Sequence, residues 1–179
     1  MAGSEPSALG RPQGLIIRQY RKADREALAA LFYQIQQEEF PWVDGDTLSL
    51  QDFERATEGE RIFVAELDGV PAGFCSVWEP DSFVHNLFVA KGCRRAGVGS
   101  ALLGAVEELA RRCGCKRLWL VTTNDNTHAL AFYQRRGFVL AALHRDAVTE
   151  ARRVLKPTIP LVGEGDLPIR DELELEKRL

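Results

Sequence analysis

The segment that most constrains the fold passes from a strand through a glycine-containing loop into a helix. Its sequence is LFVAKGCRRAGVGSALL, residues 87–103. An apolar run is followed by Gly97 and Gly99, and apolar residues then recur at helical spacing. A helix start presents unpaired N–H groups and the positive end of the helix dipole, and glycines let a ligand approach the backbone closely. With Arg94 and Arg95 beside it, this turn is a candidate site for a pyrophosphate group.

Two common phosphate-binding motifs do not fit this turn. A Walker loop requires a lysine directly after its last glycine, whereas Gly99 is followed by Ser100 and Ala101. A dinucleotide fingerprint requires a small residue where Leu102 stands, and it normally opens the first strand–helix unit of its fold. Glycines at a strand–helix turn also serve packing alone, so the surrounding order of elements has to decide.

The periodicity of apolar residues predicts an alternation of strands and helices. The hairpin signal Asp68-Gly69 joins two of the strands. This order predicts one α/β domain, or α+β with a mixed sheet, in which helices flank the central sheet. Strands are expected at 15–20, 61–67, 70–78, 83–89, 116–121, 138–143 and 171–177, and helices at 24–40, 50–56, 98–113 and 126–136.

Both ends of the chain differ in composition from this central part. Residues 1–13 are small and polar and are predicted to be disordered, which leaves 14–179 as a single domain. Residues 146–179 form a C-terminal tail that ends in a closing strand with one acidic face. That face either attracts a cationic substrate or is the solvated outer face of an edge strand.

Composition and charge exclude several classes of protein. The net charge of −3 argues against nucleic acid or an anionic membrane as a partner. No apolar stretch approaches the roughly 18 residues of a membrane span, and the N-terminus lacks a secretory signal. Four cysteines are too few for a disulfide scaffold, and no cysteines or histidines have metal-ligand spacing. We therefore expect a cytoplasmic enzyme or binding module without a metal.

Two motifs together resemble the signatures of the GNAT superfamily of N-acetyltransferases. The first is R-x-x-G-x-G at 94–99, directly after the strand that ends at Val89. The second contains Asn126, Ala129, Phe132, Tyr133, Gly137 and Phe138. One helix and one strand separate the motifs, as in that family. The resemblance covers roughly residues 15–145 and is specific over 83–138. It implies the GNAT-like acyl-CoA N-acyltransferase fold, with acetyl-CoA as cosubstrate.

The resemblance also implies which residues bind coenzyme A. The amides of the 94–100 loop would hold the pyrophosphate, and the preceding strand would pair with the pantetheine arm like an added strand. Where the family often has an acidic residue and a proline after this strand, Ala90 and Lys91 stand here. The expected cofactor-binding residues are Leu87, Phe88, Val89, Arg94, Arg95, Ala96, Gly97, Val98, Gly99, Ser100, Asn126 and Tyr133.

Acetyl transfer to an amine requires a base, a donor for the tetrahedral intermediate and an acid for the leaving thiolate. An amine with a pKa of about 10 is mostly protonated at pH 7, so a base has to remove the proton. The N–H of Leu87 is the candidate donor. Tyr133, which the resemblance places near the sulfur, is the candidate acid, unless it is only a core aromatic. His85 is the candidate base, because period-two alternation puts it on one face with Phe83, Leu87 and Val89. A structural buried histidine is the alternative.

The acceptor is the least determined part of the prediction. Glu38, Glu39, Trp42 and Asp44 stand where the family builds its acceptor pocket and would suit a cationic amine, although a plain surface loop is also compatible. The predicted function is direct acetyl transfer to a primary amine of a small molecule. A protein or peptide acceptor, a non-catalytic acyl-CoA-binding module, an acetyl intermediate on Cys93 and a homodimer stay open.

Overall fold

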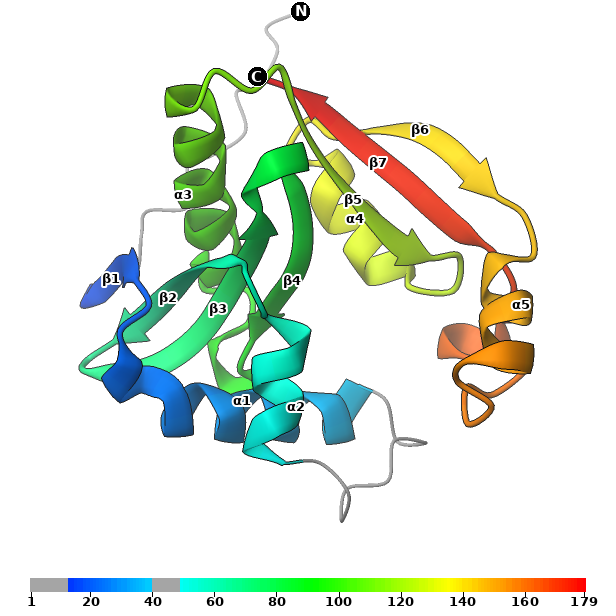
Figure 1. Cartoon of the computed structure of the whole chain (residues 1–179), viewed down its shortest axis with the longest axis horizontal. Coiled ribbons are helices and arrows are strands. Elements are labelled where there is room, and N and C mark those ends of the chain that lie inside the picture. The colour runs from blue at the N-terminus through cyan, green and yellow to red at the C-terminus, as the bar shows by residue number, and fades with distance from the viewer. Residues whose placement is uncertain (1–12, 40–48) are drawn as a thin grey trace, which may run out of the picture.

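The computed structural model describes residues 13–39 and 49–179. Within them, seven strands form one mixed sheet in the order β1-β2-β3-β4-β5-β7-β6, with helices on both faces (Figure 1). This confirms the predicted fold class. The strands are β1 (Leu15–Gln19), β2 (Arg61–Leu67), β3 (Val70–Trp78), β4 (Phe83–Val89), β5 (Arg117–Thr123), β6 (Val139–His144) and β7 (Glu172–Arg178). The helices are α1 (Arg25–Glu39), α2 (Leu50–Ala56), α3 (Val98–Arg112), α4 (Thr127–Gln134) and α5 (Ala147–Val154). The predicted disorder of 1–13 lies, except for Gln13, outside the described residues.

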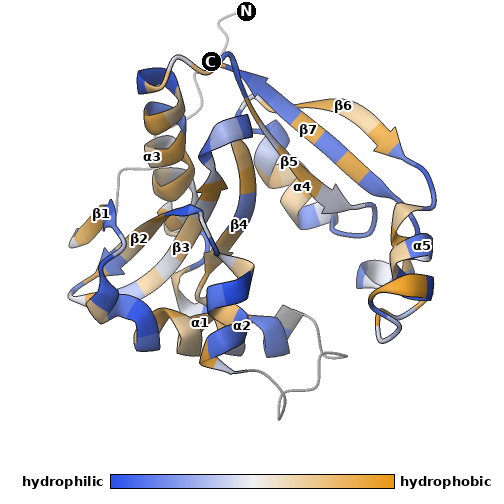
Figure 2. Cartoon of the chain, viewed as in Figure 1, coloured by the Kyte–Doolittle hydropathy of each residue, from blue (hydrophilic) through white to orange (hydrophobic). Residues whose placement is uncertain are grey.

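Each face of the sheet has its own hydrophobic core. On one face, Leu102 and Val106 of α3 are completely buried against β2, β3 and β5. On the other face, Phe32 of α1 and Phe53 of α2 pack against Phe74 of β3, with 5.6 Å between the ring centroids of Phe53 and Phe74. The apolar stretches of β2, β3 and β4 lie between these helices (Figure 2). The central strands are therefore fixed from both sides.

The sheet opens between β4 and β5, which are parallel. Their register contains one pair, Phe83 opposite Trp119, and the N–H of Trp119 donates to the carbonyl of Ser82 at 3.2 Å. Beyond this pair the two strands diverge (Figure 1). On its other side, β4 stays paired with β3 as far as Val89. One edge of β4 therefore remains open over the second half of the strand, and we call this opening the splay.

The C-terminal tail differs from its prediction in two ways. It contains helix α5, which was not predicted, and its strand β7 pairs with β5 on one side and β6 on the other. The prediction of an edge strand was wrong, because β7 buries Leu175 inside the sheet and β6 takes the edge. Two glutamates of its acidic face, Glu174 and Glu176, accept from Arg117 at 3.4 and 3.0 Å. No described helix is long and apolar enough to cross a membrane.

Candidate active site

The loop before α3 has the geometry expected of an anion site. Helix α3 begins at Val98, and the N–H groups of its first turn have no partner within the helix. The residue before the helix provides no side-chain cap for them either. Gly97 precedes it with φ +81°, a left-handed conformation that favours glycine. Arg95 is also left-handed, at φ +63°, which is costly for a residue with a side chain. The loop therefore makes a tight turn and leaves the positive end of α3 uncovered by side-chain caps.

Gly99 lies at a close contact between three elements. A Cβ atom at this position would lie 3.3 Å from the ring of Phe132 in α4 and 3.6 Å from the side chain of Val89. The absence of a side chain lets α4, the start of α3 and the end of β4 meet at one point. The two sequence motifs are thus brought together in space.

Arg136 joins the same point, and sequence reasoning did not select it. Its Nε donates to the Ser100 hydroxyl at 3.0 Å, Nη1 donates to the Phe132 carbonyl at 2.9 Å, and Nη2 also donates to the hydroxyl. The guanidinium lies 3.6 Å from the ring centroid of Phe132. Burial lowers its pKa, and repulsion by Arg135 adds to this effect. No described carboxylate pairs with it. The sequence signal available for Arg136 was its spacing, because it follows the inward-facing Phe132 by four residues and such residues lie close together along a helix.

The backbone of β4 faces the splay at alternate residues. Ala90 donates its N–H to β3, so the backbone groups of Phe88 also face β3 and those of Leu87 and Val89 face the splay. Arg94 lies on this open side, where its Nε donates to the Val89 carbonyl at 3.3 Å. Leu87 and Val89 can therefore offer the backbone hydrogen bonds proposed for a pantetheine arm, whereas the Phe88 ring packs in the core beneath α1.

Tyr133 is buried where α4 meets the sheet. Its ring centroid lies 5.1 Å from that of Phe132 and 5.5 Å from that of Phe138. Burial raises the pKa of Tyr133 far above its usual value, the nearby Cys75 raises it further, and Arg136 opposes the shift. The phenol therefore keeps its proton at neutral pH, as an acid for a leaving thiolate has to.

Asn126 of the second motif and Cys93, which directly precedes the first motif, have structural contacts. Asn126 begins α4, where its Oδ1 accepts from the N–H of Ala129 at 3.1 Å. This cap fixes the side chain beside the splay and leaves its Nδ2 to donate elsewhere. Cys93 is a half-buried free thiol that packs against the core beneath α3.

His85 occupies a β-bulge. Val84 and Asn86 lie opposite consecutive residues of β3, so His85 between them is the extra residue. The bulge breaks the alternation, and Val84 packs on the same face as Leu87 and Val89. The prediction that His85 shares a face with Leu87 and Val89 was therefore wrong. Strict alternation of side chains from Phe83 to Val89 requires a regular strand. The extra residue of the bulge puts Val84, rather than His85, on the face of Leu87 and Val89.

The His85 side chain instead meets Glu60. Its Nδ1 lies 2.7 Å from Oε1 of Glu60, and its ring stacks on Phe83 with 5.7 Å between the centroids. The His85 side chain is 48% exposed, whereas that of Glu60 is 7% exposed. Sequence reasoning missed Glu60. The hairpin at Asp68 was the signal available in the sequence, because it fixes how β2 aligns with β3. In that alignment the starts of β2 and β4 lie on either side of the same end of β3.

Glu60 also lines a concavity with a volume of about 590 Å³. This concavity lies between the end of β1, helix α2 and the start of β2. It carries three carboxylates, two aromatic rings and other polar groups. The lining residues are Tyr20, Gln51, Phe53, Glu54, Arg55, Thr57, Glu58, Glu60 and Ile62. Its acidic lining suits a cationic ligand.

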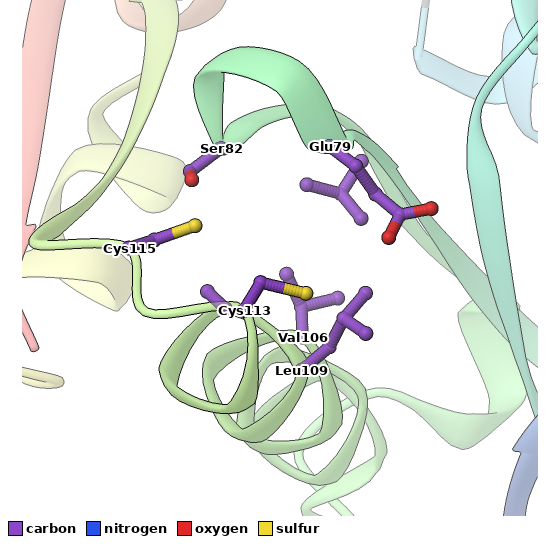
Figure 3. A pocket seen from close by; sticks show the side chains of 8 residues that line it. Glu79, Ser82, Val106, Leu109, Cys113 and Cys115 are labelled. Atoms are coloured by element: carbon purple, nitrogen blue, oxygen red, sulfur yellow. The ribbon is translucent and has the colours of Figure 1, made fainter.

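A second cavity, of about 10 Å³, has room for about one water molecule. It lies between the C-terminal end of α3 and the turn after β3, and the side chains of Cys113 and Cys115 line it (Figure 3). Both cysteines are free thiols. Within 13–39 and 49–179, no group of three or more His, Cys, Asp or Glu side chains is arranged to hold a metal ion.

The predicted acceptor loop is described only in part. Trp42 and Asp44 lie outside the described residues, as does the side chain of Glu39. Glu38 at the end of α1 pairs with Arg94, with 4.0 Å between its Oε2 and the Nη2 of Arg94. This carboxylate therefore contacts the loop before α3.

Comparison with known proteins identifies the class. Residues 29–138 match the model of the acetyltransferase (GNAT) family. This match covers more than half of the chain, so the protein belongs to the GNAT family.

Individual relatives agree with this assignment. The chain is 46% identical over 103 residues to Uncharacterized protein YdhI of Bacillus subtilis (strain 168), with 58% of each chain covered. It is 34% identical over 122 residues to streptothricin acetyltransferase of Streptomyces lavendulae, with 61% of this chain and 65% of that one covered. The matched part thus spans less than two thirds of either relative. A GNAT family acetyltransferase from Elizabethkingia anophelis with acetyl-CoA bound superposes with a TM-score of 0.72 at 18% identity, covering 93% of this chain and 99% of that one.

Proposed function

We propose that this protein transfers the acetyl group of acetyl-CoA to a primary amine of a small molecule by direct attack. The observation that carries the proposal is the splay, which ends at the uncapped start of α3. A β-strand with one open edge offers hydrogen bonds to an extended pantetheine arm, and a helix start with adjacent arginines offers charge to a pyrophosphate. The residues present fit both parts of coenzyme A.

The cofactor-binding residues of the proposal come from three elements. Leu87 and Val89 offer backbone groups at the splay, and residues 94–100 offer the amides of the turn. Asn126 and Tyr133 approach from α4. Arg136 adds a cation that has no described carboxylate partner, so a bound diphosphate would supply the missing negative charge.

The chemical step needs no covalent enzyme intermediate. The amine nitrogen bonds to the thioester carbonyl carbon, and the carbon–sulfur bond then breaks. The N–H of Leu87 stabilises the developing oxyanion, His85 takes the amine proton, and Tyr133 gives a proton to the leaving thiolate. The products are an N-acetyl amide and coenzyme A with a free thiol, and solvent restores both side chains to their starting protonation.

The concavity beside His85 favours a small cationic amine as acceptor. Its volume of about 590 Å³ lies within the range of small-molecule sites. Glu54, Glu58 and Glu60 give its lining a negative charge, although Arg25 pairs with Glu54. Glu60 connects the concavity to His85, because it lines the first and binds the second.

Thiol release from acetyl-CoA across a panel of amines tests the proposal. We expect release that depends on both acetyl-CoA and a small cationic amine, with the N-acetyl product identified by mass spectrometry. Release with a peptide panel alone would move the acceptor to a protein or peptide amine. Tight acetyl-CoA binding with no release for any acceptor would indicate a non-catalytic acyl-CoA-binding module.

The edge strand β6 supports a homodimer as the oligomeric state. Val139, Leu140 and Leu143 are each more than half exposed on it, and an unpaired edge with apolar side chains favours association with another strand. Light scattering of the protein with Leu140→Lys and Leu143→Lys tests this contact, and we expect the variant to be monomeric.

A further inference from the structure

Glu60 is the last residue before β2, and its side chain reaches His85 on β4, two strands away. The distance from Glu60 Oε1 to His85 Nδ1 is 2.7 Å, which is short for a hydrogen bond that involves nitrogen and oxygen. The Glu60 side chain is 7% exposed and its partner is 48% exposed. A buried carboxylate thus holds one end of the imidazole, and the rest of the ring reaches solvent.

This contact defines the state of the imidazole. A carboxylate accepts hydrogen bonds, so Nδ1 of His85 carries the hydrogen and Nε2 is left with its lone pair. Free imidazole in water has no such fixed arrangement, because either nitrogen can carry the hydrogen. Stacking on Phe83 restricts the ring plane further.

The position of the pair relates it to the reaction. Phe83 and Trp119 form the one described pair between β4 and β5, and His85 follows Phe83 by two residues. His85 is therefore at the vertex of the splay, where the strands begin to diverge. Leu87, the proposed oxyanion donor, is two residues further along the same strand.

The second oxygen of Glu60 lacks a partner among the described residues. Glu60 Oε2 is buried and has no hydrogen-bond partner in the described part of the chain. His85 from β4 contacts Glu60, the charged side chains of Glu54, Arg55 and Glu58 line the same concavity, and Glu60 interacts electrostatically with the buried thiol of Cys75 in β3. No lysine or arginine among residues 13–39 and 49–179 forms an ion pair with it. A proton taken up by His85 would therefore supply the positive charge that Glu60 lacks.

We propose that Glu60 is a positioning residue for His85. It holds His85 with hydrogen on Nδ1 and the Nε2 lone pair toward the acceptor, and it stabilises the imidazolium that forms when Nε2 takes the amine proton. This inference rests on the proposed acetyl transfer, in which His85 is the base. Only the amine proton moves in this step, from nitrogen to Nε2, and Glu60 keeps its charge throughout.

Two substitutions separate the parts of this role. Glu60→Gln keeps a carbonyl that can accept from Nδ1 but removes the charge, whereas Glu60→Ala removes both. We expect kcat to fall about 10-fold in E60Q and about 100-fold in E60A, and the second value equals the lower limit of the 10²–10⁴-fold contribution of a general base. The affinity for coenzyme A should stay within about twofold of wild type, because none of the described contacts of Glu60 is to the loop before α3. Thermal melting checks that both variants fold.

Glu174→Gln is the matched control, because Glu174 lies 3.2 Å from Nε2 of His144 in a carboxylate–imidazole pair away from the splay. We expect kcat of E174Q to match wild type. In a His85→Ala background, E60Q should cause no further loss, since its effect passes through the imidazole. An equal loss in both backgrounds would overturn the proposal and make Glu60 structural.

Nitrogen NMR of the His85 ring tests the geometry without any acceptor. We expect hydrogen on Nδ1 in wild type and in E60Q, and a shift toward hydrogen on Nε2 in E60A. An unchanged ring signal in E60A would refute the positioning role even if acetyl transfer is confirmed. Absence of turnover with the expected ring signal would instead refute the proposed function and leave the Glu60–His85 geometry intact.

Discussion

Replacement of Arg136 by methionine tests how the loop before α3 and helix α4 cooperate. Arg136 donates to Ser100 in the first turn of α3 and lies over the ring of Phe132. Methionine keeps an apolar chain against that ring and removes the charge. Burial lowers the pKa of Arg136, repulsion by Arg135 adds to this effect, and no described carboxylate pairs with the guanidinium. A bound diphosphate is the compensation that we expect.

The size of the effect follows from the type of bond lost. A hydrogen bond to a charged group contributes about 1.5–3 kcal/mol, which corresponds to roughly 10- to 150-fold in affinity. Arg136 is only partly buried, so screening by solvent places the expected loss near the lower end, about tenfold. Higher salt should reduce the difference between variant and wild type.

Titration calorimetry with coenzyme A and with acetylpantetheine, which lacks the diphosphate, separates charge from packing. We expect Arg136→Met to weaken coenzyme A binding and to leave acetylpantetheine binding unchanged. Arg135→Met is the matched control, because Arg135 is its exposed neighbour of the same type, and it should bind coenzyme A like wild type. Equal losses for the two variants, or an equal loss for both ligands, would refute the role of Arg136.

Five further outcomes are expected. Tyr133→Phe should lower kcat by about 10- to 10⁴-fold with acetyl-CoA affinity nearly intact; unchanged kcat would exclude it as the acid. Because burial raises the pKa of Tyr133, its phenol stays protonated, so kcat should show no alkaline decline from this group below about pH 10. His85→Ala should lower kcat by about 10²- to 10⁴-fold, and an unchanged kcat would assign the base to a more distant group. Gly97→Glu should abolish coenzyme A binding, since it places bulk and negative charge at a left-handed position, and retained affinity in a folded variant would contradict the site. Truncation after Val154 should lower the melting temperature or cause aggregation, because it removes the buried Leu175; a cooperatively folding truncation would show that the tail is an appendage.

Local sequence signals predicted most of the elements because each signal acts within a few residues. Asp68-Gly69 alone sets a tight turn, and β2 and β3 have the bounds that it indicated. The start of α3 follows from Gly97 and Gly99 in the same way. The family assignment rested on two such motifs, and their meeting at Gly99 is a consequence of packing between them.

Long-range pairing explains what could not be predicted. The bulge at His85 depends on how β4 aligns with β3, so the sequence of β4 alone indicated a regular alternation. The pairing of β7 with both neighbours depends on where the tail returns to the sheet. Helix α5 has eight residues and buries only Val148 among them, so its apolar pattern is too short to be recognised in the sequence.

The contacts of Glu60 and Arg136 were missed for a related reason. Glu60 precedes a strand and Arg136 follows a helical motif, and the signals available for them, the hairpin at Asp68 and the four-residue spacing from Phe132, indicate a position but not the partner of the side chain. Their partners, His85 and Ser100, are 25 and 36 residues away along the chain. Only the packed structure brings each charged side chain to its partner.

Thiol release measured before and after addition of the amine tests direct transfer most directly. The protein is mixed with acetyl-CoA alone, free thiol is followed, and the acceptor amine is then added. We expect no release before the amine and one free thiol per molecule of N-acetyl product after it. A burst of thiol equal to the protein concentration before the amine would contradict direct attack and indicate an acetylated side chain, with Cys93 as the first candidate.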